Sequence, residues 1–150
     1  MLINKKITLR QINRLKFNIK FNIFYKFRFH KDYLKNNIDN KIFSKKDSRI
    51  WFKRNYKKKI IFSINYNNKK IGLIIYNLKN CYYSIIILKQ YRNKKAGTAA
   101  LNKLVNFLRR KKLKLVTMIN TNNKNSIYIH KKIAKSYKKI NSKFIFFKIL

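Results

Sequence analysis

The stretch from Cys81 to Arg110 constrains the fold more than any other part of the sequence. It begins with CYYSIIIL (residues 81–88), a nearly continuous apolar and β-branched run typical of a buried central strand. After the short basic segment KQYRNKKAG, apolar residues recur at helical spacing: Ala100, Leu101, Leu104, Val105 and Leu108. A strand, a loop and an amphipathic helix over residues 96–110 predict one α/β unit.

The rest of the chain supplies further strands and helices. Residues 7–12 alternate apolar and polar and indicate a first strand, while residues 15–34, dense in Phe, Ile and Tyr, indicate one or two helices. Further strands are predicted at residues 59–65, 70–78, 113–119 and 144–150, and a further helix at residues 126–134. Antiparallel hairpins followed by βαβ units predict an α/β (α+β) fold, with residues 1–150 forming a single domain.

Two short sequence motifs indicate where a helix begins and where two strands are joined. Ser44 and Asp47 resemble a capping box, which predicts a helix start there. That helix is expected to turn three residues inward: Ile50, Trp51 and Phe52. The segment YNNK at residues 66–69 carries turn residues between two predicted strands, so a hairpin is expected.

The charge of the chain is extreme and has two interpretations. Forty Lys and Arg against three Asp and Glu give a net charge of +37. Such a field attracts polyanions, and a basic chain rich in aromatics suits RNA binding. However, Lys, Asn, Ile, Phe and Tyr share A/T-rich codons, and the chain has two glycines and no proline. We favour codon bias as the main cause, and expect non-specific attraction of polyanions in either case.

Other classes of protein are disfavoured by what the sequence lacks. No apolar stretch approaches the roughly 20 residues that cross a bilayer, so no membrane span is expected. Cys81 is the single cysteine and cannot form an internal disulfide; we interpret it as a small core residue, with a reactive thiol as the alternative. No Cys/His cluster has metal-ligand spacing, so no metal is expected. We expect a soluble cytoplasmic protein.

The loop around Gly97 combines the features of a phosphate-binding site. The first amides of a helix have no intrahelical partner, and the helix dipole adds partial positive charge there. Glycine lets the backbone come close to an anion, and Arg92, Lys94 and Lys95 flank the loop. The alternative is that Gly97 only makes the turn from strand to helix, and spacing alone does not decide between the two.

The same loop resembles a known family. The segment SIIILKQYRNKKAGTAAL (residues 84–101) is similar to the cofactor loop of the GNAT superfamily of acyl-CoA-dependent N-acyltransferases, in which Arg/Gln-x-x-Gly-x-Gly/Ala follows the fourth strand. Arg92 takes the Arg/Gln place and Gly97 the last glycine place, whereas Lys95 replaces the first glycine. The segment NKNSIYIHKKIA (residues 123–134) resembles a second family motif, with Asn123 and Ser126 in their expected places and Ala134 replacing a glycine.

A third motif resembles the acceptor side of a subgroup. Residues 24–52 are similar to GNAT enzymes of the pseudaminic-acid-pathway type, which acetylate nucleotide-linked amino sugars. The matching residues are Arg28, Ser44, Trp51 and Phe52. The departures are Phe27 where the pattern has Trp, and Ser48 where it has His.

The resemblance implies a fold and a cofactor. It implies a mixed, mostly antiparallel central sheet flanked by helices, with the fourth and fifth strands splayed to admit the pantetheine of acetyl-CoA (coenzyme A). The exposed strand backbone of residues 84–88 would then bond the pantetheine amides and the thioester oxygen. The cofactor-binding residues implied are Ile86, Ile87, Leu88, Arg92, Lys94, Lys95, Ala96, Gly97, Thr98, Asn123 and Ser126.

The resemblance also implies candidates for proton transfer. His130 falls where the family often has a tyrosine general acid, so we expect it to protonate the leaving thiolate; the alternative is a histidine on a solvent-facing helix side. His30 is the candidate acceptor of the amine proton, with a surface histidine as the alternative. Tyr82, where many relatives have Glu, and Tyr83 are interpreted as sheet packing.

Four residues are candidates for binding the acceptor: Arg28, Asp32, Trp51 and Phe52. Asp32 would position a sugar or orient a base, although a structural ion pair is the alternative, and Trp51 and Phe52 would equally serve as helix packing.

The reaction implied is acetyl transfer from acetyl-CoA to a primary amine by direct attack. The small-molecule acceptor expected from the third motif is a nucleotide-linked amino sugar. Two alternatives stay open: a protein N-terminus or ribosomal protein as acceptor, or an inactive basic protein that binds RNA or ribosomes. The sequence does not indicate an oligomeric state.

Overall fold

Two antiparallel sheets form the fold of this computed structural model, which describes residues 6–29, 43–92 and 95–150. The larger sheet has the order β1-β2-β3-β4 and the smaller the order β5-β7-β6. The strands are β1 (Ile7–Gln11), β2 (Lys59–Tyr66), β3 (Lys69–Asn77), β4 (Tyr83–Ile87), β5 (Val116–Asn120), β6 (Ser136–Lys139) and β7 (Phe144–Lys148). The helices are α1 (Phe17–Arg28), α3 (Lys45–Asn55), α4 (Ala96–Arg110) and α5 (Lys124–Ile133), with short 3-10 turns at Tyr56–Lys58 and Lys89–Tyr91.

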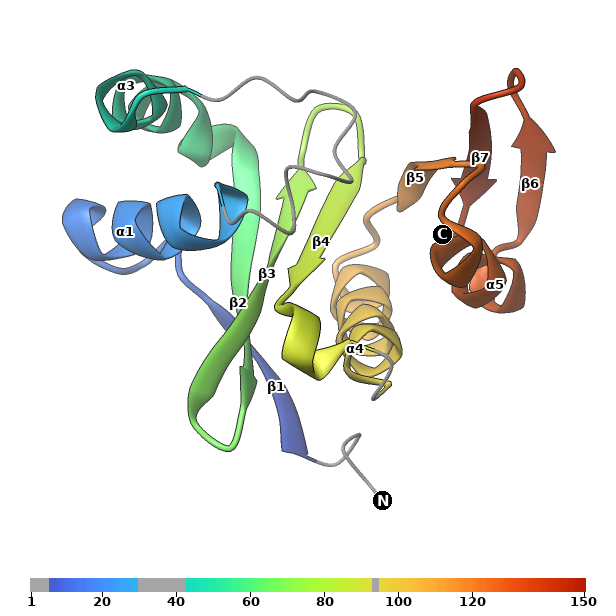
Figure 1. Cartoon of the computed structure of the whole chain (residues 1–150), viewed down its shortest axis with the longest axis horizontal. Helices are drawn as coiled ribbons and strands as arrows, with labels where there is room; N and C mark the ends of the chain where they lie inside the picture. The colour runs from blue at the N-terminus through green and yellow to red at the C-terminus, as the bar shows by residue number, and fades with distance from the viewer. Residues whose placement is uncertain (1–5, 30–42, 93–94) are drawn as a thin grey trace.

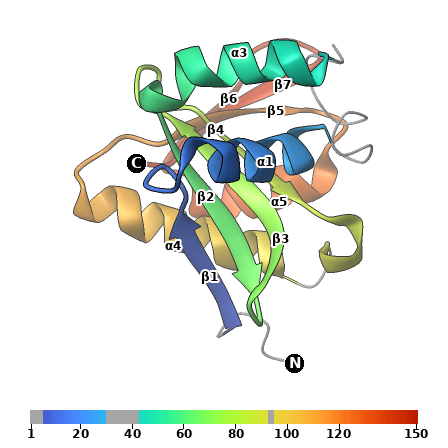
Figure 2. The same cartoon turned by 90° about the vertical axis from the view of Figure 1, so that its left-hand side faces the viewer.

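The larger sheet has helices on both faces. Helices α1 and α3 lie on one face and α4 on the other (Figure 1). Figure 2 shows α1 in front of strands β2 and β3, with α3 above α1, when the molecule is turned by 90°. Each face has its own apolar core, one built on aromatic residues such as Phe21, Phe24 and Phe52, the other on the apolar stripe of α4. Both faces of the central strands are therefore buried, as their apolar runs predict.

The two sheets meet at one point and then separate. Tyr82 and Val116 form an isolated parallel bridge, and the Val116 amide donates to the Cys81 carbonyl at 3.1 Å. Beyond this bridge β4 pairs only with β3, and β5 pairs only with β7. Figure 1 shows the resulting separation of β4 from β5. The predicted mixed sheet with a splayed fourth and fifth strand is confirmed, and β4 has one unpaired edge.

Most predicted elements are present, with two differences. The helix over residues 96–110 and the Ser44 cap are confirmed, since the Asp47 amide donates to the Ser44 hydroxyl oxygen at 3.0 Å. Strand β6 was not predicted, because its sequence SYKK is exposed at every position and shows no alternation. The inward direction predicted for three residues of α3 is wrong for Ile50 and Trp51, which are 44% and 45% exposed, and right for Phe52.

Residues other than glycine occupy the left-handed backbone positions. Five of the described residues have positive φ, namely Asn67, Asn68, Cys81, Lys95 and Lys112, and neither glycine does. Asn67 and Asn68 form the predicted hairpin turn, in which asparagine tolerates this conformation best after glycine. Lysine and asparagine stand where proteins usually place glycine, which supports codon bias as a cause of the composition.

Candidate functional site

Helix α4 begins with backbone amides that have no partner in the helix. The first intrahelical bond runs from the Ala99 amide to the Lys95 carbonyl at 3.0 Å, so the amides of Ala96, Gly97 and Thr98 precede the ladder. Lys95 is the N-cap residue, with φ 60°, and its side chain makes no capping bond. These amides are therefore directed out of the helix and favour a negatively charged ligand.

Gly97 is not required by the turn. Its φ is not positive, and a Cβ placed on it would meet only the Ile87 Cδ1 atom, at 3.4 Å, which is an ordinary contact. The left-handed residue of the turn is Lys95, two positions earlier. The structure therefore argues against the interpretation that Gly97 only makes the turn from strand to helix. The missing side chain leaves open surface beside the free amides.

Replacing Lys95 by glycine should stabilise the fold. A residue with a Cβ costs about 1–2 kcal/mol in the left-handed region, and the greater freedom of glycine in the unfolded chain returns part of that gain. We expect Lys95→Gly to raise the free energy of unfolding by up to about 1 kcal/mol, measured by urea denaturation. Lys111→Gly, at φ −88°, is the matched control and should lower it. The same sign for both variants would contradict the strain at Lys95.

Arg92 ties the basic loop to the end of β4. Its Nε donates to the Ile87 carbonyl at 2.8 Å, and the side chain is half-buried. This bond holds the guanidinium at the end of β4, and the Nη groups of a guanidinium can bind an anion. Lys94 lies outside the described residues.

The unpaired edge of β4 presents alternate backbone groups to the gap. The Asn77 amide donates to the Tyr82 carbonyl at 2.8 Å and the Leu88 amide to the Ile71 carbonyl at 3.0 Å. In an antiparallel pair this register directs the polar backbone groups of every second residue toward β3, so Ile86 also bonds there. The residues whose amides and carbonyls face β5 are Tyr83, Ile85 and Ile87.

This alternation corrects the expected backbone contacts. In this register Ser84, Ile86 and Leu88 direct their backbone groups to β3, so these three residues do not offer the strand contact expected of them. Ile85 takes their place, and the amide of Ile87 is directed away from β3 while its carbonyl accepts from Arg92. The sequence indicates a strand here. It does not indicate which edge of the strand pairs, and hence not which alternate residues direct their backbone groups to the gap.

Asn123 and Ser126 are joined by a helix cap. The Asn123 side-chain oxygen accepts a bond from the Ser126 amide at 3.2 Å, which caps α5. The Asn-x-x-Ser spacing thus has a local structural reason.

His130 is buried and bonded at both ring nitrogens. Only 4% of its surface is exposed. Its Nδ1 lies 2.6 Å from the Ser126 carbonyl oxygen, and its Nε2 is hydrogen-bonded to the Tyr83 hydroxyl on β4. The solvent-facing alternative for His130 is therefore wrong, and so is the interpretation of Tyr83 as packing alone.

Burial also shifts the ionisation of this pair. It lowers the pKa of His130, an effect partly offset by the bond to Ser126, and raises the pKa of Tyr83. Both side chains are thus neutral near neutral pH. No pattern in the sequence joins residues 83 and 130, which lie on different elements.

Three of the residues expected to bind the acceptor lie within the described ranges: Arg28, Trp51 and Phe52. Trp51 is half-exposed and stacks on Phe24, with ring centroids 5.9 Å apart. Phe52 is 1% exposed in the aromatic core, so its expected contact with an acceptor is corrected: it supports α3 against α1. The Arg28 guanidinium, at the end of α1, lies 5.9 Å from the centroid of the Phe29 ring. His30 and Asp32 lie outside the described residues.

The described ranges contain neither a membrane-spanning helix nor a cluster of metal-binding side chains. No helix within residues 6–29, 43–92 and 95–150 is long and apolar enough to span a bilayer. The same residues hold no group of three or more His, Cys, Asp or Glu side chains placed to bind a metal ion.

The site fits a nucleotide-linked thioester cofactor. Free helix amides, open surface at Gly97 and the cations Arg92 and Lys95 suit a diphosphate, and the unpaired edge at Ile85 and Ile87 suits the amides of an extended arm. The splay between β4 and β5 begins at the Tyr82–Val116 bridge and opens toward this helix start.

Comparisons with known proteins agree with this geometry. Residues 25–134 match the Acetyltransferase (GNAT) family. A spermidine N-acetyltransferase chimera that includes the Vibrio cholerae enzyme has a TM-score of 0.74 at 14% identity, covering 97% of this chain and 95% of that one. A domain from Methanocaldococcus jannaschii has a TM-score of 0.73 at 19% identity, covering 97% and 99%.

A third solved structure contains the cofactor. The spermidine N-acetyltransferase of Vibrio cholerae in complex with CoA and spermine has a TM-score of 0.71 at 14% identity, covering 97% of this chain and 96% of that one. At these identities the likeness concerns the fold, and no curated protein matches the sequence. The match to the family extends over most of the chain. The chain belongs to the GNAT acetyltransferase family, and it is an acyltransferase that uses acetyl-CoA to acetylate amines.

Proposed function

We propose that this enzyme acetylates the primary amine of an anionic small molecule, for which a nucleotide-linked amino sugar is the best candidate. The observation that carries this proposal is the scarcity of acidic residues: the chain has three, against forty Lys and Arg. Within the described ranges Asp47 is the single acidic residue, and its carboxylate accepts a bond from the Ser44 hydroxyl at 2.6 Å. A cationic acceptor would find few carboxylates to bind it.

The net charge also distinguishes this enzyme from the spermidine acetyltransferases that share its fold. A polyamine carries several positive charges, and a protein of net charge +37 repels it at low ionic strength. A nucleotide diphosphate attached to the acceptor reverses the sign of that interaction. The match of Arg28, Ser44 and Trp51 to enzymes acting on nucleotide-linked amino sugars supports the same acceptor.

The groups proposed to bind the acetyl donor lie at the start of α4 and on the unpaired edge of β4. The amides of Ala96, Gly97 and Thr98, with Arg92 and Lys95, would hold the diphosphate, and the backbone of Ile85 and Ile87 would hold the pantetheine arm. Bound acetyl-CoA supplies an activated thioester carbonyl, which the acceptor amine attacks directly. A cytoplasmic location is also proposed, because the acetyl donor is available there.

The acceptor is tested by comparing three amines. We expect kcat/KM for a UDP-linked amino sugar to exceed that for the free amino sugar and for spermidine, with the advantage shrinking as salt rises because exposed charges are screened. Release of the CoA thiol, followed with a thiol reagent, measures all three rates. A preference for spermidine at about 0.2 M salt would contradict the proposed acceptor, since long-range repulsion is weak under that condition.

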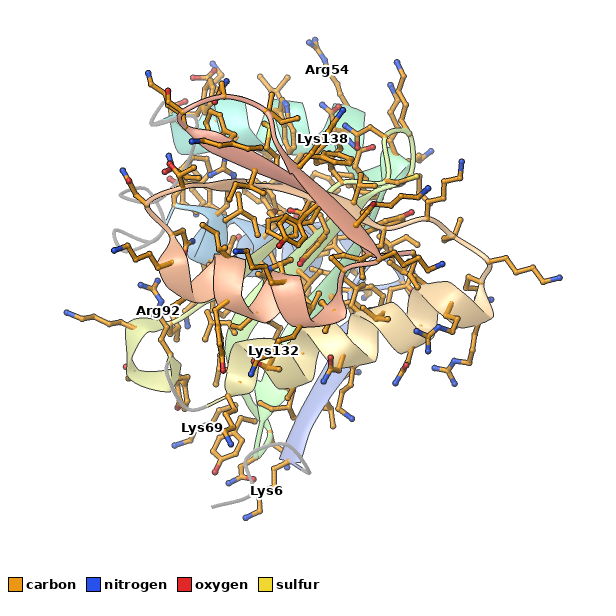
Figure 3. All side chains as sticks on the ribbon, turned by 90° about the vertical axis from the view of Figure 1, so that its right-hand side faces the viewer. Lys6, Arg54, Lys69, Arg92, Lys132 and Lys138 are labelled. Carbon is orange, nitrogen blue, oxygen red and sulfur yellow. The ribbon has the colours of Figure 1, made fainter. Side chains whose placement is uncertain are left out.

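The charge alone does not favour the RNA-binding alternative. Labelled cations on several elements, among them Arg54, Lys69, Arg92 and Lys138, project toward different sides of the molecule (Figure 3). A nucleic-acid interface is typically a basic patch or stripe on one face. A charge spread over many sides attracts polyanions without defining such a face.

A further inference from the structure

The pair formed by Tyr83 and His130 lies beside the point where the two sheets separate. Tyr83 directly follows Tyr82, which forms the bridge to Val116, and it is the first residue of β4 on the unpaired side. Its ring stacks against the His130 ring, with centroids 5.9 Å apart at an interplanar angle of 25°. The pair therefore joins β4 to α5 at the closed end of the gap.

The hydrogen bonds determine where the protons lie. A backbone carbonyl only accepts hydrogen bonds, so the Nδ1 atom 2.6 Å from the Ser126 carbonyl oxygen carries a proton. In a neutral imidazole the other nitrogen, Nε2, then has a free lone pair, and the Tyr83 hydroxyl donates to it. The pair thus has the order of hydroxyl, imidazole and fixed acceptor that activates a hydroxyl oxygen in other enzymes.

We propose that Tyr83 is a catalytic residue whose hydroxyl, with His130 as its positioning and proton-holding partner, carries the proton from the attacking amine to the leaving thiolate. As the C–N bond forms, Tyr83 takes a proton from the amine nitrogen and passes its own to His130 Nε2. As the C–S bond breaks, Tyr83 gives its proton to sulfur and recovers one from His130. The amine loses one proton, the thiolate gains one, and the pair returns to its initial state.

Tyr83 is the neighbour of His130 that can exchange a proton with it, because the other groups around the imidazole are apolar or are engaged elsewhere. Phe147 of β7 packs on the imidazole, with centroids 5.5 Å apart, and is apolar. On α5 itself, Lys131 lies over the Tyr137 ring at 5.3 Å and Lys132 donates to the Tyr128 hydroxyl at 2.5 Å. Among the described residues, the titratable group seen bonded to the imidazole is therefore Tyr83.

The inference rests on the proposed acetyl transfer, whichever amine is the acceptor, and kinetics of three variants test it. Tyr83→Phe should lower kcat by about 10²- to 10⁴-fold, the range of general acid–base catalysis, with unchanged affinity for desulfo-CoA. Tyr82→Phe, one residue earlier with its ring against Phe146, is the matched control and should keep the wild-type rate. His130→Gln keeps an acceptor for the Tyr83 hydroxyl but takes up no proton, so it should also lose activity.

The pH profile separates catalysis from packing. His130 must be neutral to take a proton, and burial lowers its pKa below the ordinary value of about 6.5. The limb that His130 contributes to wild-type kcat/KM should therefore lie below about pH 6.5, separate from the limb that deprotonation of the acceptor amine contributes in every variant, and His130→Gln should lack it. A full rate in Tyr83→Phe, or the same limb in His130→Gln, would overturn the proposal.

A spectroscopic measurement works without any acceptor or acetyl donor. Imidazole ¹⁵N shifts of the free enzyme should show a protonated Nδ1 and an unprotonated Nε2 for His130. A proton on Nε2 would overturn the shuttle even if the enzyme is active. An inactive wild type would overturn the proposed function and the shuttle together, whereas active wild type with equally active Tyr83→Phe would overturn the shuttle alone.

Discussion

Gly97→Glu should abolish the binding of acetyl-CoA while leaving the fold intact. The new carboxylate would project from the first turn of α4 beside the amides of Ala96 and Thr98, where the diphosphate is proposed to bind. Two charges about 5 Å apart repel by about 3 kcal/mol at an effective dielectric constant of 20, and steric overlap adds to this. A loss of at least about 100-fold in affinity is expected, measured by calorimetry with desulfo-CoA.

Two control variants distinguish damage to the diphosphate site from the general effect of a changed net charge. Asn102→Glu changes the net charge equally at an exposed position of the same helix and should leave affinity nearly unchanged. Gly97→Ala adds only a methyl group and should weaken binding less than Gly97→Glu. The titrations should be run at about 0.2 M salt, because the field of a +37 protein attracts any polyphosphate at low salt. ADP serves as the comparison ligand. Equal losses in Gly97→Glu and Asn102→Glu would contradict the diphosphate site.

The order of elements was predictable because it follows from local pattern. The stripe from Ala100 to Leu108 gives α4 its bounds, and the Ser44 cap gives α3 its start. The motif around Gly97 indicated the helix start that the structure confirms. These signals depend on neighbouring residues in the chain, so a single sequence contains them.

The features that were not predictable depend on contacts between distant segments. Which edge of β4 lies unpaired decides whether Ile86 or Ile85 presents its amide to the gap, and that depends on the pairing with β3. The bond between Tyr83 and His130 requires α5 to lie against β4. The exposure of Trp51 follows from the angle at which α3 packs on α1, a choice that an aromatic-rich helix leaves open.

Gly72 is required by the close packing of the sheet, whereas the surroundings of Gly97 leave room for a side chain. A Cβ on Gly72 would lie 2.2 Å from the Ile86 carbonyl oxygen and 3.1 Å from Ile64 Cδ1, so β3 passes too close to its neighbours for any side chain. Because the obstructing atom is backbone, Gly72→Ala must displace β4 or break its pairing. We expect a loss of about 3 kcal/mol or more in the free energy of unfolding, measured by urea denaturation.

Gly97→Ala is the matched control for this substitution, since the same methyl group there meets only Ile87 Cδ1 and alanine favours a helix by up to about 1 kcal/mol over glycine. The two alanine variants should therefore differ in the sign of their effect on stability. Gly72→Ala should also weaken desulfo-CoA binding although residue 72 lies outside the proposed site, because the displaced strand carries Ile85 and Ile87. Wild-type stability in Gly72→Ala would contradict the close approach of β3 and β4. It would then also contradict the position of the unpaired edge of β4 that borders the gap.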